Sequence, residues 1–232
     1  MRRIAGLVLA LAVCLSTPAL AGIALAPQAG SLSQLIPLTT WDKQFKITEG
    51  KDRGRVVALT LRRDQDKNGS WYLTFGDYAG VVLSNSGRGL MVDRLDLFKS
   101  HSQIVYENPL PILTPEIIDG RARRLQVGFK MFDAETGRLK RSGRVTHWVK
   151  RVSPSRFDTP AGVIDGYFLE IDHRMDMPYA QLQMALGLGC RLDEGPVFGS
   201  GLYTLTKLGI FTESKTAAAA LTKVTGPVPS VR

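Results

Sequence analysis

The sequence lacks the motifs from which most catalytic centres are built. It has three histidines, and it contains no Gly-x-Ser-x-Gly turn, no His-Glu-x-x-His helix, no phosphate-binding glycine loop and no dinucleotide fingerprint. Two acidic residues near the middle of the chain, Asp165 and Asp172, fall on opposite faces of a predicted strand, so they do not form a catalytic carboxylate pair. We therefore predict no catalytic residue and no cofactor.

Cysteine is also scarce. Of the two cysteines, Cys14 lies near the N-terminus within an apolar run, so only Cys190 belongs to the body of the protein. One cysteine cannot form an internal disulfide, and a reactive thiol needs a basic partner on the same face. We expect Cys190 to be a small buried residue.

The N-terminal apolar run is too short to span a membrane. Residues 4–15 are apolar and follow the basic pair Arg2 and Arg3, whereas a membrane span needs about 20 such residues. Pro18 and the small residues up to Ala21 complete a secretory signal, with residues 1–21 removed on export. We therefore predict a bacterial periplasmic protein. The alternatives are a membrane-tethered lipoprotein modified at Cys14 and an uncleaved anchor.

Basic residues exceed acidic ones, 30 to 21, for a net charge of +9. They are dispersed, with no basic helix and no interleaved aromatic residues, which argues against nucleic-acid binding. An excess of this size favours anionic lipid surfaces, or it is the ordinary basicity of an exported protein. Arg121, Arg123 and Arg124 are candidate contacts for anionic headgroups, and peripheral contact with an envelope membrane is expected.

Hydrophobic periodicity predicts an all-β fold, mainly antiparallel, in the form of a curved sheet or open β-barrel with at most a few short helices. Asn68-Gly69 is a hairpin signal, and residues 125–131 alternate in a second hairpin with 139–152. We expect a Pro-rich connection at 108–115, a Gly-rich loop at 187–201, and helix or strand at 179–188. The predicted divisions are a leader at 22–40, one β domain at 41–226 and a frayed tail at 227–232.

A long strand is predicted over residues 163–177, and its odd-numbered face is mainly apolar. Side chains two residues apart in a strand share a face, so this face points inward. We predict that it lines a hydrophobic groove. The candidate ligand-binding residues are Tyr167, Leu169, Ile171, His173, Met175 and Met177.

The segment that leads into this strand, Phe157-Asp-Thr-Pro-Ala-Gly-Val-Ile-Asp-Gly-Tyr-Phe-Leu-Glu170, resembles a motif of uncharacterised bacterial periplasmic β-proteins. In those families a Thr/Val-Pro-Ala-Gly turn is followed by an aspartate and an apolar strand. The resemblance covers about fourteen residues. It implies an open, curved β-barrel somewhat like the lipoprotein carriers of the envelope, and it carries no catalytic residues.

Two patterns are typical of metal ligands. Asp64, Asp66 and Asn68 resemble the start of a calcium loop, although Phe75 occupies the place of its closing glutamate, so a polar hairpin tip is the simpler interpretation. His173, Met175 and Met177 share a strand face and offer the soft donors that suit copper(I), with Met184 as a further candidate. Because methionine also fills irregular cores, a cavity lining explains the same residues.

These observations lead to one functional hypothesis with two alternatives. We predict an exported protein of the cell envelope that binds a hydrophobic or anionic lipid-like ligand in a groove of its curved sheet. The alternatives are a periplasmic metal-binding module, for copper or calcium, and a non-catalytic structural or interaction protein.

Overall fold

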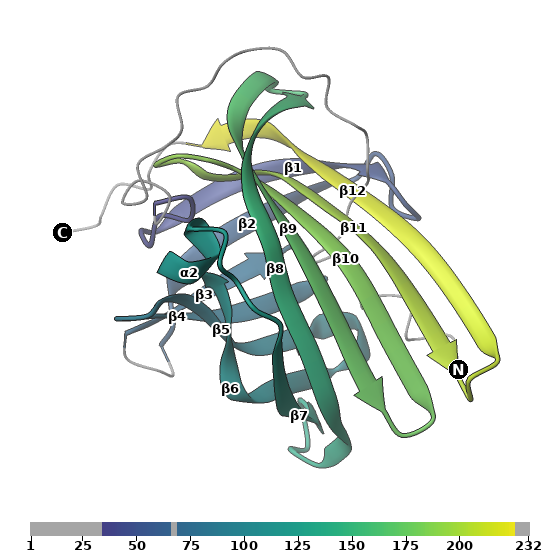
Figure 1. Ribbon diagram of the computed structural model, residues 1–232. Helices are drawn as coiled ribbons and strands as arrows, with labels where there is room; N and C mark the ends of the chain where they lie inside the picture. The colour runs from purple at the N-terminus through teal and green to yellow at the C-terminus, as the bar shows by residue number, and fades with distance from the viewer. Residues whose placement is uncertain (1–33, 66–68, 226–232) are drawn as a thin grey trace.

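The described part of the chain is a barrel of antiparallel strands (Figure 1). The structure is a computed structural model, and it describes residues 34–65 and 69–225. A 3-10 turn, η2 (Phe98–Ser100), and a short helix, α2 (Pro115–Ile118), interrupt the strands. The strands are β1 (Trp41–Glu49), β2 (Val56–Arg63), β3 (Ser70–Phe75), β4 (Ala79–Ser86), β5 (Gly89–Leu97), β6 (Ser102–Leu113), β7 (Leu125–Asp133), β8 (Leu139–Thr159), β9 (Gly162–Met177), β10 (Ala180–Arg191), β11 (Gly195–Lys207) and β12 (Phe211–Thr225).

The predicted all-β, antiparallel class is confirmed, and the barrel is closed. Each strand pairs with its neighbours in sequence, and β12 returns to pair with β1, for example at Phe45 and Leu221. Closure gives every described strand a partner on both sides over part of its length, which leaves only short edges, as on β6 beyond Tyr106, as templates for aggregation. The N-terminal signal and Cys14 lie outside the described residues, and no described helix is long and apolar enough to cross a membrane.

Alternation of side chains builds the core. On β1, Phe45 and Ile47 are buried while Lys46 between them is exposed. On β9 the odd-numbered residues from Leu169 to Met175 are buried, so the face predicted to point inward does so. Because one face of every strand meets inside the barrel, most of these side chains form one large apolar cluster, and Ala217 and Ala218 form a small separate one.

The predicted hairpins form. β7 pairs with β8, and β2 pairs with β3 around a turn whose central residues, 66–68, lie outside the described part. β8 and β9 meet at the Thr-Pro-Ala-Gly turn, where the Thr159 hydroxyl donates to the carbonyl oxygen of Gly162 at 2.8 Å. Gly162 has a φ of +112°, a conformation that side chains rarely adopt.

The Pro-rich connection predicted at 108–115 is wrong, because β6 continues to Leu113. β6 pairs with β7 only as far as Tyr106, so the remainder has β5 as its one partner strand. There Pro111 lies opposite Met91, between two irregularities of register. Proline is tolerated where a strand edge needs no N–H donor.

The Gly-rich loop predicted at 187–201 is also wrong, since these residues complete β10 and begin β11 around a short turn at 192–194. The ambiguous segment 179–188 is strand from Ala180 onward. The glycines make room for aromatic rings. A Cβ atom at Gly187 would lie 2.2 Å from the Phe168 ring, and one at Gly189 would lie 2.7 Å from the Phe157 ring. Close packing of rings on the backbone, rather than loop flexibility, explains these glycines.

The two ends of the barrel differ. At the packed end, near the β8–β9 and β10–β11 turns, Leu35, Cys190 and Val197 are fully buried. At the open end, the β5–β6, β7–β8, β9–β10 and β11–β12 connections surround a hollow of about 740 Å³. In Figure 1 the tips of the β9–β10 and β11–β12 hairpins extend downward at this open end.

Candidate ligand-binding site

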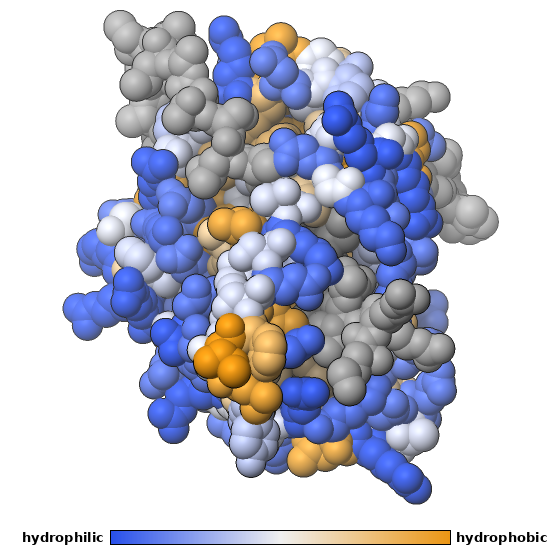
Figure 2. Space-filling model, turned by 90° about the vertical axis from the view of Figure 1, so that its right-hand side faces the viewer, coloured by the Kyte–Doolittle hydropathy of each residue, from blue (hydrophilic) through white to orange (hydrophobic). Residues whose placement is uncertain are grey.

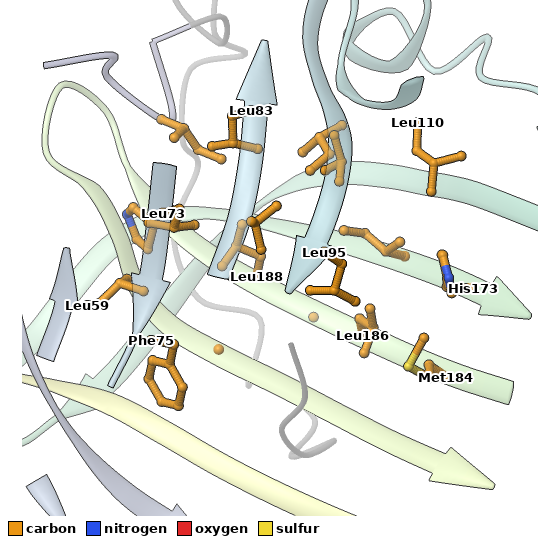
Figure 3. Close-up of a pocket in the computed structure, with 18 of the residues that line it drawn as sticks. Leu59, Leu73, Phe75, Leu83, Leu95, Leu110, His173, Met184, Leu186 and Leu188 are labelled. Carbon is orange, nitrogen blue, oxygen red and sulfur yellow. The ribbon is translucent and has the colours of Figure 1, made fainter. Parts of the chain in front are cut away.

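An apolar cavity of about 130 Å³ lies inside the barrel, between the two ends. Leucine side chains from β2 to β5 face those of β10 across it (Figure 3). The wall formed by β11 and β12 presents two small residues to the cavity, Gly199 and Ala219, beside the larger Pro196 and Phe198. A Cβ atom placed on Gly199 would have no neighbour within 4 Å, so larger residues at that position would occupy the cavity.

Three ring-bearing polar side chains line this cavity: Tyr106, His147 and His173. Strand pairing brings the histidines together, because His147 on β8 and Met184 on β10 are the register partners of His173 on β9. Figure 3 shows His173 beside Met184 at one side of the cavity. The Tyr106 ring meets the His173 ring edge-on at 6.2 Å.

The two histidines form a directed hydrogen-bond chain. His147 Nε2 lies 2.8 Å from the carbonyl oxygen of Pro111, and the two Nδ1 atoms lie 3.3 Å apart. A carbonyl oxygen only accepts, so the proton of a neutral His147 is on Nε2 and its Nδ1 is an acceptor. His173 Nδ1 then donates to it. This leaves His173 Nε2 as a bare acceptor, and that buried atom has no hydrogen-bond partner.

Burial keeps both imidazoles neutral. Desolvation lowers the pKa of His173 to about 3, and the neighbouring His147 lowers it further in the same direction. Burial also lowers the pKa of His147, although its bond to Pro111 opposes the shift. A neutral pair is consistent with the tautomers assigned above, since each ring then carries one proton.

The six residues predicted to bind ligand take three different positions. Ile171 and His173 line the cavity. Met177 lines the hollow at the open end. Leu169 and Met175 are fully packed core residues, and Tyr167 is a partly buried neighbour of the core near the packed end. The contribution of all six to ligand binding stays a prediction.

The residues predicted to bind metal are not gathered into one described site. His173 and Met177 are four strand residues apart, about 13 Å along β9, and Met177 lines a different hollow. Asp66 and Asn68 lie outside the described residues, and Asp64 precedes them. Among residues 34–65 and 69–225, no three His, Cys, Asp or Glu side chains form a cluster that could hold a metal ion.

A buried lysine, which sequence patterns did not single out, lies near the packed end. Lys43 Nζ donates to the carbonyl oxygen of Pro196 at 3.0 Å and lies 5.5 Å from the Trp41 ring centre. Desolvation lowers the pKa of Lys43 to about 8. Burial raises the pKa of Cys190 to about 12 despite this cation, so Cys190 is a protonated core residue, as expected.

The hollow at the open end combines basic and apolar residues. Its described lining includes Lys99, Lys140, Arg141 and Lys207 and no acidic residue. Asp133 pairs with Lys140 at 2.8 Å. Around the hollow, Tyr179, Leu208, Ile210 and Phe211 expose 81, 62, 76 and 63% of their surface. Figure 2, which views the molecule from the right-hand side of Figure 1, shows an orange patch standing out among blue residues.

The arginines predicted to meet anionic headgroups lie elsewhere. Arg121, Arg123 and Arg124 belong to the connection between α2 and β7, at the opposite end of β7 from the open-end hollow. Arg121 pairs with Asp119 at 2.6 Å, and the guanidinium of Arg124 lies 5.0 Å from the Trp148 ring centre. Their role toward headgroups stays a prediction.

No protein-family model and no curated protein matches this chain. Solved structures that resemble it include the hypothetical lipoprotein YmcC of Escherichia coli K12, with 10% identity, coverage of 82% of this chain and 90% of that one, and a TM-score of 0.38. A candidate lipoprotein from Parabacteroides distasonis has 9% identity, coverage of 82% and 98%, and a TM-score of 0.36. A candidate exported protein with a YmcC-like fold from Bacteroides fragilis has 8% identity, coverage of 80% and 94%, and a TM-score of 0.35. Such TM-scores describe a weak structural resemblance and transfer no function to this chain.

Proposed function

We propose that the protein is an exported envelope protein that binds an apolar ligand, or the apolar end of a lipid-like ligand, inside the barrel. The observation that carries the proposal is the interior cavity of about 130 Å³, whose wall is almost entirely aliphatic and aromatic. Protein interiors are normally packed without voids of this size. An apolar cavity of about 150 Å³ in another protein stays dry and binds benzene, so this one suits a group of about six or seven heavy atoms.

The wall itself supports binding over simple imperfect packing. Gly199 faces open space, and its backbone does not require glycine, because its φ lies outside the left-handed region. A larger residue would therefore fill the cavity and stabilise the barrel by burying more apolar surface. Glycine at position 199 makes the barrel less stable than a larger residue would, and it preserves the cavity.

The test is to titrate the protein with hexane and follow the methyl resonances of labelled methionine. Met184 lines the cavity and Met131 lines the open-end hollow, so we expect the Met184 resonance to shift and the Met131 resonance to stay. Gly199→Leu should abolish the Met184 shift without lowering the melting temperature. Gly87→Leu is the matched control, because Gly87 also has no neighbour within 4 Å but is exposed in the β4–β5 turn.

Two results of this titration would overturn the proposal. If hexane leaves Met184 unchanged, or shifts it equally in the native protein and in Gly199→Leu, the cavity does not bind apolar ligands. The alternative hypothesis of a structural barrel would then account for the fold better.

We also propose that the open end contacts an anionic membrane surface. Ile210 and Phe211 are exposed at the β11–β12 turn, and Arg141 and Lys207 line the hollow together with Phe211. Burial of apolar side chains in the membrane interface is favourable, and each basic residue near anionic lipids contributes about 1 kcal/mol to the binding free energy. The periplasmic location and the cleavage of residues 1–21 belong to the same proposal.

A further inference from the structure

We propose that the ligand of the cavity carries a neutral hydrogen-bond donor, a hydroxyl in the simplest case, which His173 Nε2 accepts. This inference rests on the proposed function and specifies the chemical class of the ligand. It starts from one unusual atom, because His173 Nε2 is buried and has no hydrogen-bond partner in a side chain that lines the cavity.

The direction of the hydrogen-bond chain determines what this atom can do. The Pro111 carbonyl oxygen requires the proton of His147 on Nε2, which turns His147 Nδ1 into an acceptor and fixes the proton of His173 on its Nδ1. His173 Nε2 therefore offers a lone pair and no proton. It complements a donor and repels an acceptor such as an ether oxygen or a carboxylate.

The electrostatic surroundings exclude an anion. The charged forms of His147 and His173 are both disfavoured by burial, and the third polar residue of the lining, Tyr106, has its pKa raised by burial. The described lining thus contains no cation that would compensate a buried carboxylate, whose transfer into an apolar site is expensive. The basic residues Lys99, Lys140, Arg141 and Lys207 line the open-end hollow and not the cavity.

A hydroxyl suits the site better than other neutral groups do. A buried acceptor that stays unpaired costs free energy, and a ligand that supplies the donor recovers it. A hydroxyl also accepts hydrogen bonds, so the same group is compatible with the O–H donor of the Tyr106 phenol in the same wall. A ligand with an alkyl part and one hydroxyl would fill the cavity and satisfy its single orphaned atom.

The test compares two isomers, 1-hexanol and methyl pentyl ether. They contain the same atoms and fill similar volumes, but only the alcohol donates a hydrogen bond. We expect 1-hexanol to bind about tenfold more tightly than the ether, measured by the Met184 methyl shift. Hexanoate at neutral pH should bind more weakly than either.

A double variant provides the control. His147→Leu with His173→Leu removes both imidazoles together, so no imidazole nitrogen is left unpaired and only the Pro111 carbonyl oxygen loses its donor. In this variant the two isomers should bind equally. Nitrogen-15 chemical shifts of the native histidines test the assignment without any ligand or variant, because protonated and bare ring nitrogens resonate in distinct ranges.

The outcomes separate the two proposals. Equal binding of alcohol and ether to the native protein, with both bound, overturns this inference and leaves the apolar site intact. A protonated Nε2 on His173 in the nitrogen-15 spectrum also overturns it. If neither isomer binds, both this inference and the proposed function fail.

Discussion

The packed end and the open end of the barrel are built from the same strands but differ in composition and exposure. At the packed end, Leu35, Cys190 and Val197 are fully buried, and even the charged Lys43 is only 3% exposed. At the open end, apolar residues of the turns are largely exposed, and the hollow between them is lined with basic residues.

This difference shows how one barrel can separate stability from recognition. Long strands such as β8 and β9 traverse the whole barrel, so a single strand contributes core residues at one end and rim residues at the other. Tight packing around Cys190 and Val197 at the packed end stabilises the fold. The open end keeps apolar surface that folding does not use, and such surface marks interaction sites.

Measurements of the free energy of unfolding test the difference between the two ends most directly. Leu169→Ala removes a fully buried side chain near the packed end, and we expect it to lower the free energy of unfolding by about 2–5 kcal/mol. Met177→Ala, on the same face of β9 but in the wall of the open-end hollow, should cost less than about 1 kcal/mol. Urea denaturation of both variants measures the two values. Equal losses would show that the ends do not differ in packing.

A second, smaller effect concerns the charge at the packed end. Burial lowers the pKa of Lys43 to about 8, below its value of about 10.4 in an unfolded chain. The unfolded state therefore binds more protons between these values, so stability should rise with pH across about 8 to 10.4. Lys43→Met should be more stable than the native protein at pH 7, by about 1–3 kcal/mol.

The pH dependence of the same variant checks this explanation. The stability difference between Lys43→Met and the native protein should shrink as pH rises from 8 to 10, measured by denaturation in matched buffers. The comparison cancels the titration of groups that both proteins share and that do not interact with Lys43. A constant difference would mean that Lys43 is not desolvated in the folded protein.

The smallest expected effect tests the open end as a membrane contact. Ile210→Ser removes an exposed apolar tip, and we expect it to weaken binding to vesicles that contain phosphatidylglycerol by about tenfold, measured by co-sedimentation. Val163→Ser is the control, because Val163 is 63% exposed at the packed end and should leave vesicle binding unchanged. If both variants bind like the native protein, the open end is not the contact surface.

Alternation of apolar residues was enough to predict the fold class and the inward face of β9, because successive side chains of a strand point to opposite faces of the sheet. Closure of the barrel was harder to predict, since pairing of β1 with β12 depends on strands far apart in sequence. The glycines of β10 suggested a loop, whereas they leave space for the Phe157 and Phe168 rings. Composition alone does not separate these two uses of glycine.

The histidine pair shows why the site was only partly predictable. Counting back from the turn, where Thr159 lies opposite Gly162, an unbroken register would place His147 opposite Arg174. An irregularity between Val149 and Arg151 shifts the register by one residue and places His147 opposite His173. The intervening Lys150 forms ion pairs with Glu170 and Asp172, both at 3.0 Å. A bulge of this kind leaves no clear signal in a single sequence.

Mass spectrometry of the protein isolated from its own cell envelope tests the central claim most directly. Native spectra of the unaltered protein should show a bound apolar molecule with at least one hydroxyl, and denaturing spectra should show the free polypeptide. The same preparation of Gly199→Leu should lack the bound molecule, while Gly87→Leu should retain it. A native protein without any bound molecule, or equal occupancy in Gly199→Leu, would contradict the assignment of the interior cavity as a binding site.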